Sequence, residues 1–229
     1  MKTTIVSFII ILSLSTTMAI AQSTGKTGMS FGIIGGVNFQ NLNGKDADGD
    51  KLENDMLIGF HGGINIQIPI VPEFYFQPGL LFSTKGANNE TTILGTTYTT
   101  TTNLSYIEMP LNFVYKGALG NGFVMIGFGP YVGYGIGGKV KIEGGAVTVE
   151  NDIVFQSVVE TGDDLLVPYY KAFDAGANLF AGYETAGGIF AQLNTQFGLL
   201  NINPEDKRIT DDKTAVKNTG FGLSLGYRF

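Results

Sequence analysis

The chain has 229 residues, of which 44% are hydrophobic, 15% are charged and 33 are glycine, and its formal net charge is −6. It contains no cysteine and one histidine, which excludes a disulfide framework, a thiol nucleophile, and metal sites built from thiolates or several histidines. The acidic charge balance argues against a nucleic-acid partner.

The N-terminus predicts a cleaved secretory signal peptide over residues 1–21. Lys2 supplies positive charge, residues 5–14 form a short apolar core, and Ala19-Ile20-Ala21 resembles a cleavage site. Residues 22–28 form a short polar lead-in. No later run approaches the roughly 18 apolar residues that a spanning helix needs, so the remaining hydrophobicity must be dispersed.

Apolar residues alternate with small or polar residues in eight segments, and this pattern predicts eight β-strands. We expect them at residues 29–39, 57–70, 74–85, 104–116, 122–137, 168–184, 188–200 and 220–229. The apolar face of the last strand consists of Phe221, Leu223, Leu225, Tyr227 and Phe229. Pro78, Pro110 and Pro130 fall inside strands and each removes a ladder donor, so we expect a β-bulge or a strand end at each of them.

The connections alternate between long and short. The long ones cover residues 40–56, 86–103, 138–167 and 201–217. The third contains a hairpin pattern at 140–143 and 147–149 that would extend the wall above the membrane. Long outer loops and short periplasmic turns are typical of transmembrane barrels. We therefore predict an all-β fold over residues 29–229: an eight-stranded antiparallel up-and-down transmembrane β-barrel in the cell outer membrane. A soluble lipocalin-like barrel, the alternative, would place its apolar face inward around a ligand.

Five motifs resemble the PorT-like (porin family) outer-membrane β-barrel proteins of the Bacteroidota: residues 59–63, 77–86, 106–111, 127–131 and 198–202. The resemblance spans nearly the whole mature chain, with a departure at Gly79, where the family often carries Glu. It implies an OmpA/OmpX-like eight-stranded barrel in the outer membrane, and it implies little about activity.

Alternation also predicts which polar side chains face the lumen. The expected network contains His61, Lys85, Glu108, Asp174, Gln196 and Arg228. We expect Glu184 and Arg228, which both lie near the periplasmic end, to form a second pair. Eight strands enclose an interior that side chains just fill, so we expect a polar plug rather than a wide pore. The alternative is a proton or small-ion path, in which a narrow channel or a transport or secretion accessory uses these charges.

Two further kinds of site are conceivable from the sequence, a catalytic site and a calcium site. His61, with Ser83 or Ser224 as nucleophile and Asp174 as orienting group, could support a membrane-embedded acyltransferase or hydrolase. No sequence signature brings these groups together, so we expect no enzyme and no cofactor. Asp46, Asp48 and Asp50 resemble the start of a calcium loop. However, Lys51 stands where that loop has Gly and Leu57 where it has Glu, which favours a solvated acidic loop.

The predicted barrel implies three kinds of partner. Aromatic girdles would contact outer-membrane lipid, with Phe39, Phe82 and Phe173 outside and, at the periplasmic interface, Phe74, Tyr115, Phe123, Tyr183, Tyr227 and Phe229. Tyr227 and Phe229 would also form the C-terminal signal for the barrel-assembly machinery. The outer loops would bind an extracellular ligand or protein. We therefore expect a structural or surface-interaction protein.

Overall fold

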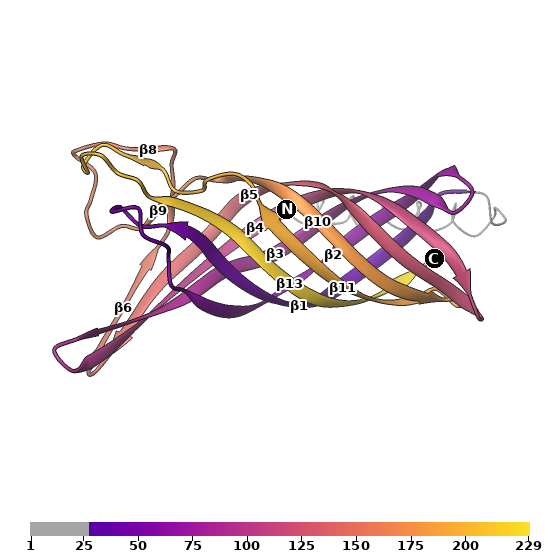
Figure 1. Ribbon diagram of the computed structural model, residues 1–229, viewed down its shortest axis with the longest axis horizontal. Helices are drawn as coiled ribbons and strands as arrows, with labels where there is room; N and C mark the ends of the chain where they lie inside the picture. The colour runs from indigo at the N-terminus through magenta and orange to yellow at the C-terminus, as the bar shows by residue number, and fades with distance from the viewer. Residues whose placement is uncertain (1–27) are drawn as a thin grey trace, which may run out of the picture.

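Eight long antiparallel strands form a closed ring in the computed structural model, which describes residues 28–229 (Figure 1). They are β1 (Ser30–Lys45), β2 (Asp55–Val71), β3 (Phe74–Ile93), β4 (Thr96–Leu119), β5 (Gly122–Gly144), β10 (Phe173–Thr185), β11 (Ile189–Gly198) and β13 (Ala215–Arg228). The predicted signal peptide lies outside the described residues. Within them, no helix is both long and apolar enough to cross a membrane.

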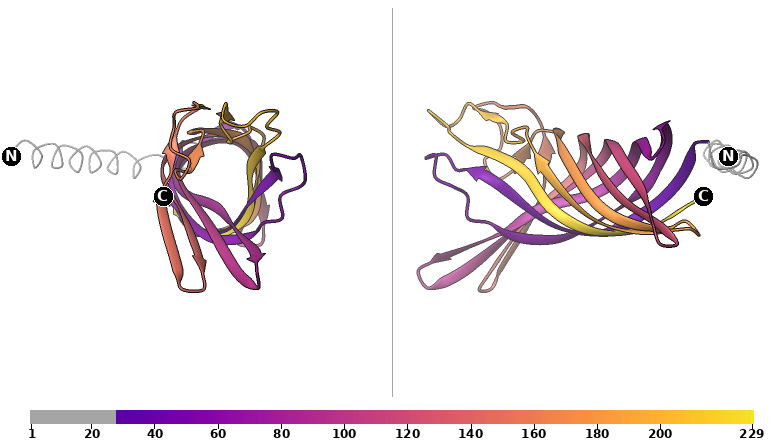
Figure 2. Two further views of the ribbon diagram at one scale, coloured as in Figure 1. Left: turned by 90° about the vertical axis from the view of Figure 1, so that its left-hand side faces the viewer. Right: turned by 45° about the vertical axis from the view of Figure 1, so that its right-hand side comes forward.

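Two pairings close the ring. The terminal strand β13 pairs with β1 from Gly32↔Arg228 to Lys45↔Ala215, as predicted, and β5 pairs with β10. The end-on view in Figure 2 shows the resulting circle of strands. Closure pairs the backbone of both seam strands and so abolishes the edges that an open sheet would leave. The prediction of an all-β, eight-stranded antiparallel transmembrane barrel is therefore confirmed.

The ring is apolar outside and polar inside. Leu193 and Leu225 of neighbouring strands are 65% and 63% exposed, while lumenal Glu108 and Asp174 are buried. This orientation suits a lipid surround and is the reverse of a soluble barrel. Aromatic pairs mark both ends of the apolar belt, with stacked Phe39 and Phe221 towards the outside.

Most of the predicted periplasmic aromatic residues lie on the outer surface, but Phe123 does not. Its ring centroid lies 4.9 Å from the lumenal Nζ of Lys116. The prediction was wrong because Phe123 has the same inward phase as the buried Met125, whereas Val124 has the outward phase.

The threonine-rich segment predicted as a loop, residues 86–103, is instead a regular hairpin. Strands β3 and β4 remain paired up to Ile93↔Thr96 and turn at Leu94-Gly95, whose φ angles are 50° and 81°. Two central residues with positive φ form the type of tight turn that matches strand twist. The segment is polar, but its many threonines are β-branched and favour strands, which the loop prediction overlooked.

The predicted hairpin at residues 140–149 is present and adds to the same structure. Strand β5 continues to Gly144 and returns as β6 (Val147–Asp152), which pairs with β5 alone in the described chain. We call residues 88–103 and 139–152 the outer sheet. It projects beyond the ring at the end opposite the C-terminus (Figures 1 and 2).

Two small parallel sheets lie at the outer end of the barrel (Figure 1). Strand β7 (Val154–Phe155) pairs with β9 (Tyr169–Tyr170), and β8 (Val158–Val159) pairs with β12 (Glu205–Asp206). The first lies within the loop between β6 and β10, and the second joins that loop to the loop after β11. The strand expected from residue 168 therefore begins at Phe173, because residues 169–170 pair within the loops.

The three prolines neither end their strands nor cause bulges, contrary to our expectation. Pro78 pairs with Leu111, Pro110 with Tyr131, and Pro130 with Ala177, and the register is the same on both sides of each. The ladder is merely interrupted nearby, as between Pro78↔Leu111 and Leu81↔Glu108. A missing N–H donor removes a hydrogen bond, but it does not require an inserted residue.

Candidate functional site

The outer half of the lumen contains a buried ion cluster. Lys85 Nζ lies 2.5 Å from Glu108 Oε1 and 3.1 Å from Asp174 Oδ2, and all three side chains are almost fully buried. Tyr131 and Asn218 donate hydrogen bonds of 3.1 and 2.9 Å to the same Asp174 oxygen. The single positive charge of the lysine thus partly offsets the negative charges of both carboxylates, and the side chain connects β3 to β4 and β10.

This cluster fixes the register of the strands more than it adds to the stability of the fold. Removing charges from water costs several kcal/mol per ion, which close opposite charges and hydrogen bonds offset. The Nζ of Lys85 also lies 4.4 Å from the ring centroid of Tyr131 and 5.3 Å from that of Tyr106, so aromatic faces cover the ammonium. Strands that slipped by one residue would turn these groups towards lipid.

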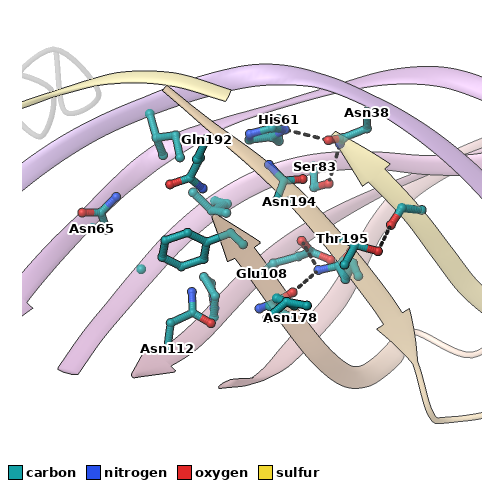
Figure 3. Close-up of a pocket in the computed structure, with 18 of the residues that line it drawn as sticks. Asn38, His61, Asn65, Ser83, Glu108, Asn112, Asn178, Gln192, Asn194 and Thr195 are labelled. Carbon is teal, nitrogen blue, oxygen red and sulfur yellow. Dashed lines mark hydrogen bonds between the residues drawn. The ribbon is translucent and has the colours of Figure 1, made fainter. Parts of the chain in front are cut away.

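His61 belongs to a second network in the middle of the lumen (Figure 3). Its Nδ1 is 2.7 Å from Asn38 Oδ1 and its Nε2 is 2.8 Å from Ser224 Oγ. An amide oxygen can only accept, so Nδ1 carries the proton in a neutral ring and Nε2 accepts from the serine hydroxyl. Asn194 donates to Ser224 at 2.7 Å, and Asn38 donates to Ser83 at 3.3 Å.

A polar cavity of about 80 Å³ adjoins this network. Gln196 extends along it, donating to Glu108 at 3.3 Å and to Asn178 at 3.1 Å. Two buried amide oxygens that line it, those of Gln40 and Asn112, have no hydrogen-bond partner among residues 28–229. A space of this size and polarity suits a few ordered waters.

The periplasmic end of the lumen holds a third network. Arg228 Nε lies 3.0 Å from Glu184 Oε2, as predicted, and Lys116 Nζ lies 2.5 Å from the other oxygen. Arg228 also donates to Asn65 at 3.0 Å and to Gln77 at 3.3 Å. This network contains two cations and one carboxylate, whereas the Lys85 cluster contains one cation and two carboxylates.

Two apolar clusters also fill parts of the barrel interior. The inner cluster consists of Val114, Met125, Phe180 and Phe190. Phe180 lines the cavity, and the Phe190 ring lies 5.3 Å from the Arg228 guanidinium carbon. The outer cluster lies beyond the Lys85 cluster and includes loop residues as a lid: Leu42, Ala87, Leu104, Tyr106, Ile153, Ile202 and Val216.

All six predicted network residues face the lumen, but they form three groups instead of one. Lys85, Glu108, Asp174 and Gln196 are connected; His61 and Arg228 belong to the other two groups. The prediction missed Lys116, Tyr131 and Asn218. Lys116 has the same even-numbered phase as Glu108 and Asn112 and could have been found. Tyr131 lies among several glycines of the inward phase, and Asn218 lies at the edge of a predicted loop.

In the acidic loop after β1, the first carboxylate binds backbone N–H groups. Asp46 Oδ1 accepts hydrogen bonds from the backbone N–H groups of Asp48, Gly49 and Asp50 at 2.9–3.1 Å. It therefore orders a tight turn. In the part of the chain that the structure describes, no three carboxylate or histidine side chains converge to hold a metal ion.

The outer loops are connected by ion pairs. Arg208 makes a forked contact with Asp206, with Nη2 2.7 Å from Oδ2, and donates to the carbonyl of Asp164 at 3.0 Å. Lys207 Nζ lies 2.7 Å from Glu160. Hydrogen bonds from the Arg208 side chain lower the pKa of Asp206 below its ordinary value. These contacts hold the loop after β11 against the loop after β6.

Comparison with known proteins agrees with this architecture. The model of the family described as "Outer membrane protein beta-barrel domain" matches residues 20–203. No curated protein matches the chain. Among solved structures, the chain is similar to Ail, the attachment invasion locus protein of Yersinia pestis, in complex with the heparin analogue sucrose octasulfate (13% identity, 88% of this chain and 99% of Ail covered, TM-score 0.39). It is also similar to Neisserial surface protein A (11% identity, 88% and 99% covered, TM-score 0.44). Since the family model covers most of the sequence, the chain belongs to the outer membrane protein β-barrel domain family.

Proposed function

We propose that this protein is a surface-interaction protein: the barrel anchors it in the outer membrane, and the outer sheet binds an extracellular partner. The observation that carries the proposal is the open edge of that sheet. Strand β6 pairs only with β5 among the described residues, and residues 90–93 of β3 extend past the last β2 pairing, at Asn88. Unpaired strand edges are templates for an additional strand.

The two faces of the outer sheet define the chemistry of such a partner. Val140, Ile142, Val147 and Val149 share the face that continues from the lumenal side, and Val147 and Val149 are 49% and 43% exposed. The opposite face carries ion pairs such as Lys139–Glu150. A strand added to β6 would meet apolar side chains on one face and charges on the other. The partner that fits is an extended segment with alternating apolar and polar residues.

Shortening both hairpins tests this proposal without touching the belt or the lumen. Residues 90–99 and 142–149 would each be replaced by Asn-Gly, which preserves the pairs Asn89↔Thr100 and Lys141↔Glu150. Cells displaying either barrel would be applied to immobilised extracellular proteins. We expect the full-length barrel to be retained on a subset of them and the shortened barrel to lose that retention. Equal retention of both barrels would contradict the proposal.

The lumen supports a structural role rather than a conducting or catalytic one. The outer apolar cluster covers the lumen, and the cavity beneath it has a volume of only about 80 Å³ and ends at partners of the buried Arg228. Ser224, His61 and Asn38 are hydrogen-bonded in the order of a catalytic triad, but all three are buried beside a cavity of about 80 Å³. That space is too small for an acyl chain, so we propose that the array orders the interior.

We also propose two finer assignments. The strand motifs favour a PorT-like member of the family, exported by the signal peptide predicted at residues 1–21. The ends of β13 and β1 support an assembly role for Tyr227 and Phe229, because the rings of these two residues pack edge to face at 4.9 Å and Phe229 N–H donates to Phe31 O at 2.8 Å. Deleting Phe229 should reduce insertion by the barrel-assembly machinery more than His61→Ala does. Equal insertion of the two variants would remove that role.

A further inference from the structure

We propose that a groove at the outer rim of the barrel binds one outer-leaflet lipid that carries a phosphate group. The groove has a volume of about 590 Å³ and lies where β5, the segment between β9 and β10, and the segment after β11 meet. Six of its lining residues carry the argument: Tyr134, Ser157, Lys171, Phe173, Leu200 and Asn201.

The lower part of the groove is apolar and continues the lipid-facing belt. Tyr134 and Phe173 are directly paired across β5 and β10, and their side chains are 61% and 53% exposed. Leu200 follows the belt residue Leu199 and is also exposed. This wall faces the bilayer, so a lipid acyl chain reaches it without leaving the membrane.

The upper part of the groove is polar and contains one cation without a partner. No carboxylate lies within 4.0 Å of Lys171 Nζ among residues 28–229. Lys139, Lys141 and Lys207 of the outer region each contact a glutamate, whereas Lys217 makes no ion pair among residues 28–229 but does not line the groove. The backbone of Lys171 is fixed by its hydrogen bond to Ile202 O at 2.7 Å.

The composition of the groove matches that of a lipid. Tyr134, Phe173 and Leu200 contribute apolar lining, and Ser157, Lys171 and Asn201 contribute polar lining. A phosphate in the polar part would accept charge-assisted hydrogen bonds from Lys171, while its acyl chain packs on Phe173 and Leu200. A free phosphate ion would use only the upper half of the groove, and a peptide would have to enter from the lipid side.

Native mass spectrometry of the refolded barrel in detergent tests this proposal. The probes are dioleoyl phosphatidylglycerol and dioleoylglycerol, which have the same acyl chains but differ in the phosphate, with inorganic phosphate as a third arm. We expect the barrel to retain phosphatidylglycerol and not dioleoylglycerol, and inorganic phosphate to leave no bound species.

Two lysine variants locate the binding. Lys171→Gln should lower the retained fraction of phosphatidylglycerol by about fivefold or more. Lys217→Gln is the matched control, because Lys217 is an exposed lysine of β13 just above the belt that does not line the groove. Heat-modifiable migration on gels would confirm that each variant is folded.

Three outcomes would overturn the proposal. Dioleoylglycerol retained as well as phosphatidylglycerol would remove the phosphate requirement. Equal losses in Lys171→Gln and Lys217→Gln would show general attraction of anionic lipid to the rim. Unchanged retention in Lys171→Gln, with Phe173→Ala and Leu200→Asn also unchanged, would place the lipid elsewhere.

Discussion

Single buried residues decide the register of this barrel, and Lys85 is the clearest case. Its ammonium is the cation shared by Glu108 and Asp174, so Lys85→Met would leave two buried carboxylates without a counter-charge. We expect a loss of about 3–5 kcal/mol in the free energy of unfolding, measured by urea titration of the barrel in lipid vesicles.

A triple variant separates charge from packing at the same site. Lys85→Met combined with Glu108→Gln and Asp174→Asn removes all three charges while preserving side-chain volume. Most of the lost stability should return, because no uncompensated charge remains. If the triple variant were as unstable as Lys85→Met alone, the packing of the lysine stem and not its charge would be the cause.

Outside the membrane, Asp206 makes the contact between the outer loops dependent on pH. Its pKa is lowered by Arg208, so the folded loops bind this proton less readily than the unfolded chain does. The stabilisation is therefore present at neutral pH and is lost as the pH falls below about 4, the ordinary range for aspartate. Amide hydrogen exchange of Glu205 and Lys207, corrected for intrinsic rates, should accelerate there. In Asp206→Asn the rates should already be raised at neutral pH and change less with acid.

At the scale of residues, the sequence predicted which side chains face the lumen but not which of them contact one another. Period-two alternation correctly placed His61, Glu108 and Arg228 in the lumen. It could not show that Glu108 contacts Lys85 while His61 contacts Asn38 and Ser224. Those contacts depend on strand tilt and stagger around the ring, which set the depth of each residue and leave no mark on a single strand.

At the scale of elements, the β3–β4 hairpin depends on its turn. Leu94 and Gly95 both have positive φ, a conformation that glycine adopts freely and β-branched residues avoid. Gly95→Val should cost about 1–2 kcal/mol locally and accelerate amide exchange of Thr92 and Thr97. Leu94→Asn should slow that exchange, because asparagine tolerates this region. Unchanged exchange in Gly95→Val would show that the strands and not the turn determine the hairpin.

Strand composition explains why this hairpin was predicted as a loop. Threonine and asparagine are both polar, and a rule based on polarity treats them alike. Threonine, however, is β-branched and pairs well across strands, as at Thr92↔Thr97. The belt strands were easier to predict because lipid demands an unbroken apolar row on one face, a constraint that ends at the membrane surface.

For the whole molecule, the side chains that fill the lumen make the barrel a closed anchor. One cavity touches all three polar networks, through Glu108, His61 and Asn65, and the outer cluster covers it with Ile153 and Ile202 from the loops. The sequence predicted a filled lumen from strand number alone. The lid was not predictable, because it depends on loops folding back over the ring.

This closure predicts that the wild-type barrel gives no steady current in planar lipid bilayers. Ions would have to pass the outer apolar cluster and the constriction where Phe190 packs on Arg228, and apolar side chains cannot replace their hydration. Opening both at once, with Ile153→Ser and Ile202→Ser in the lid and Phe190→Ser in the inner cluster, should admit water and produce a small conductance. The lid pair alone should not, because the inner cluster remains closed. A steady wild-type current that Glu108→Gln abolishes would instead show that the lumenal charges form a conducting path, and the interior would then be a selectivity element rather than a core.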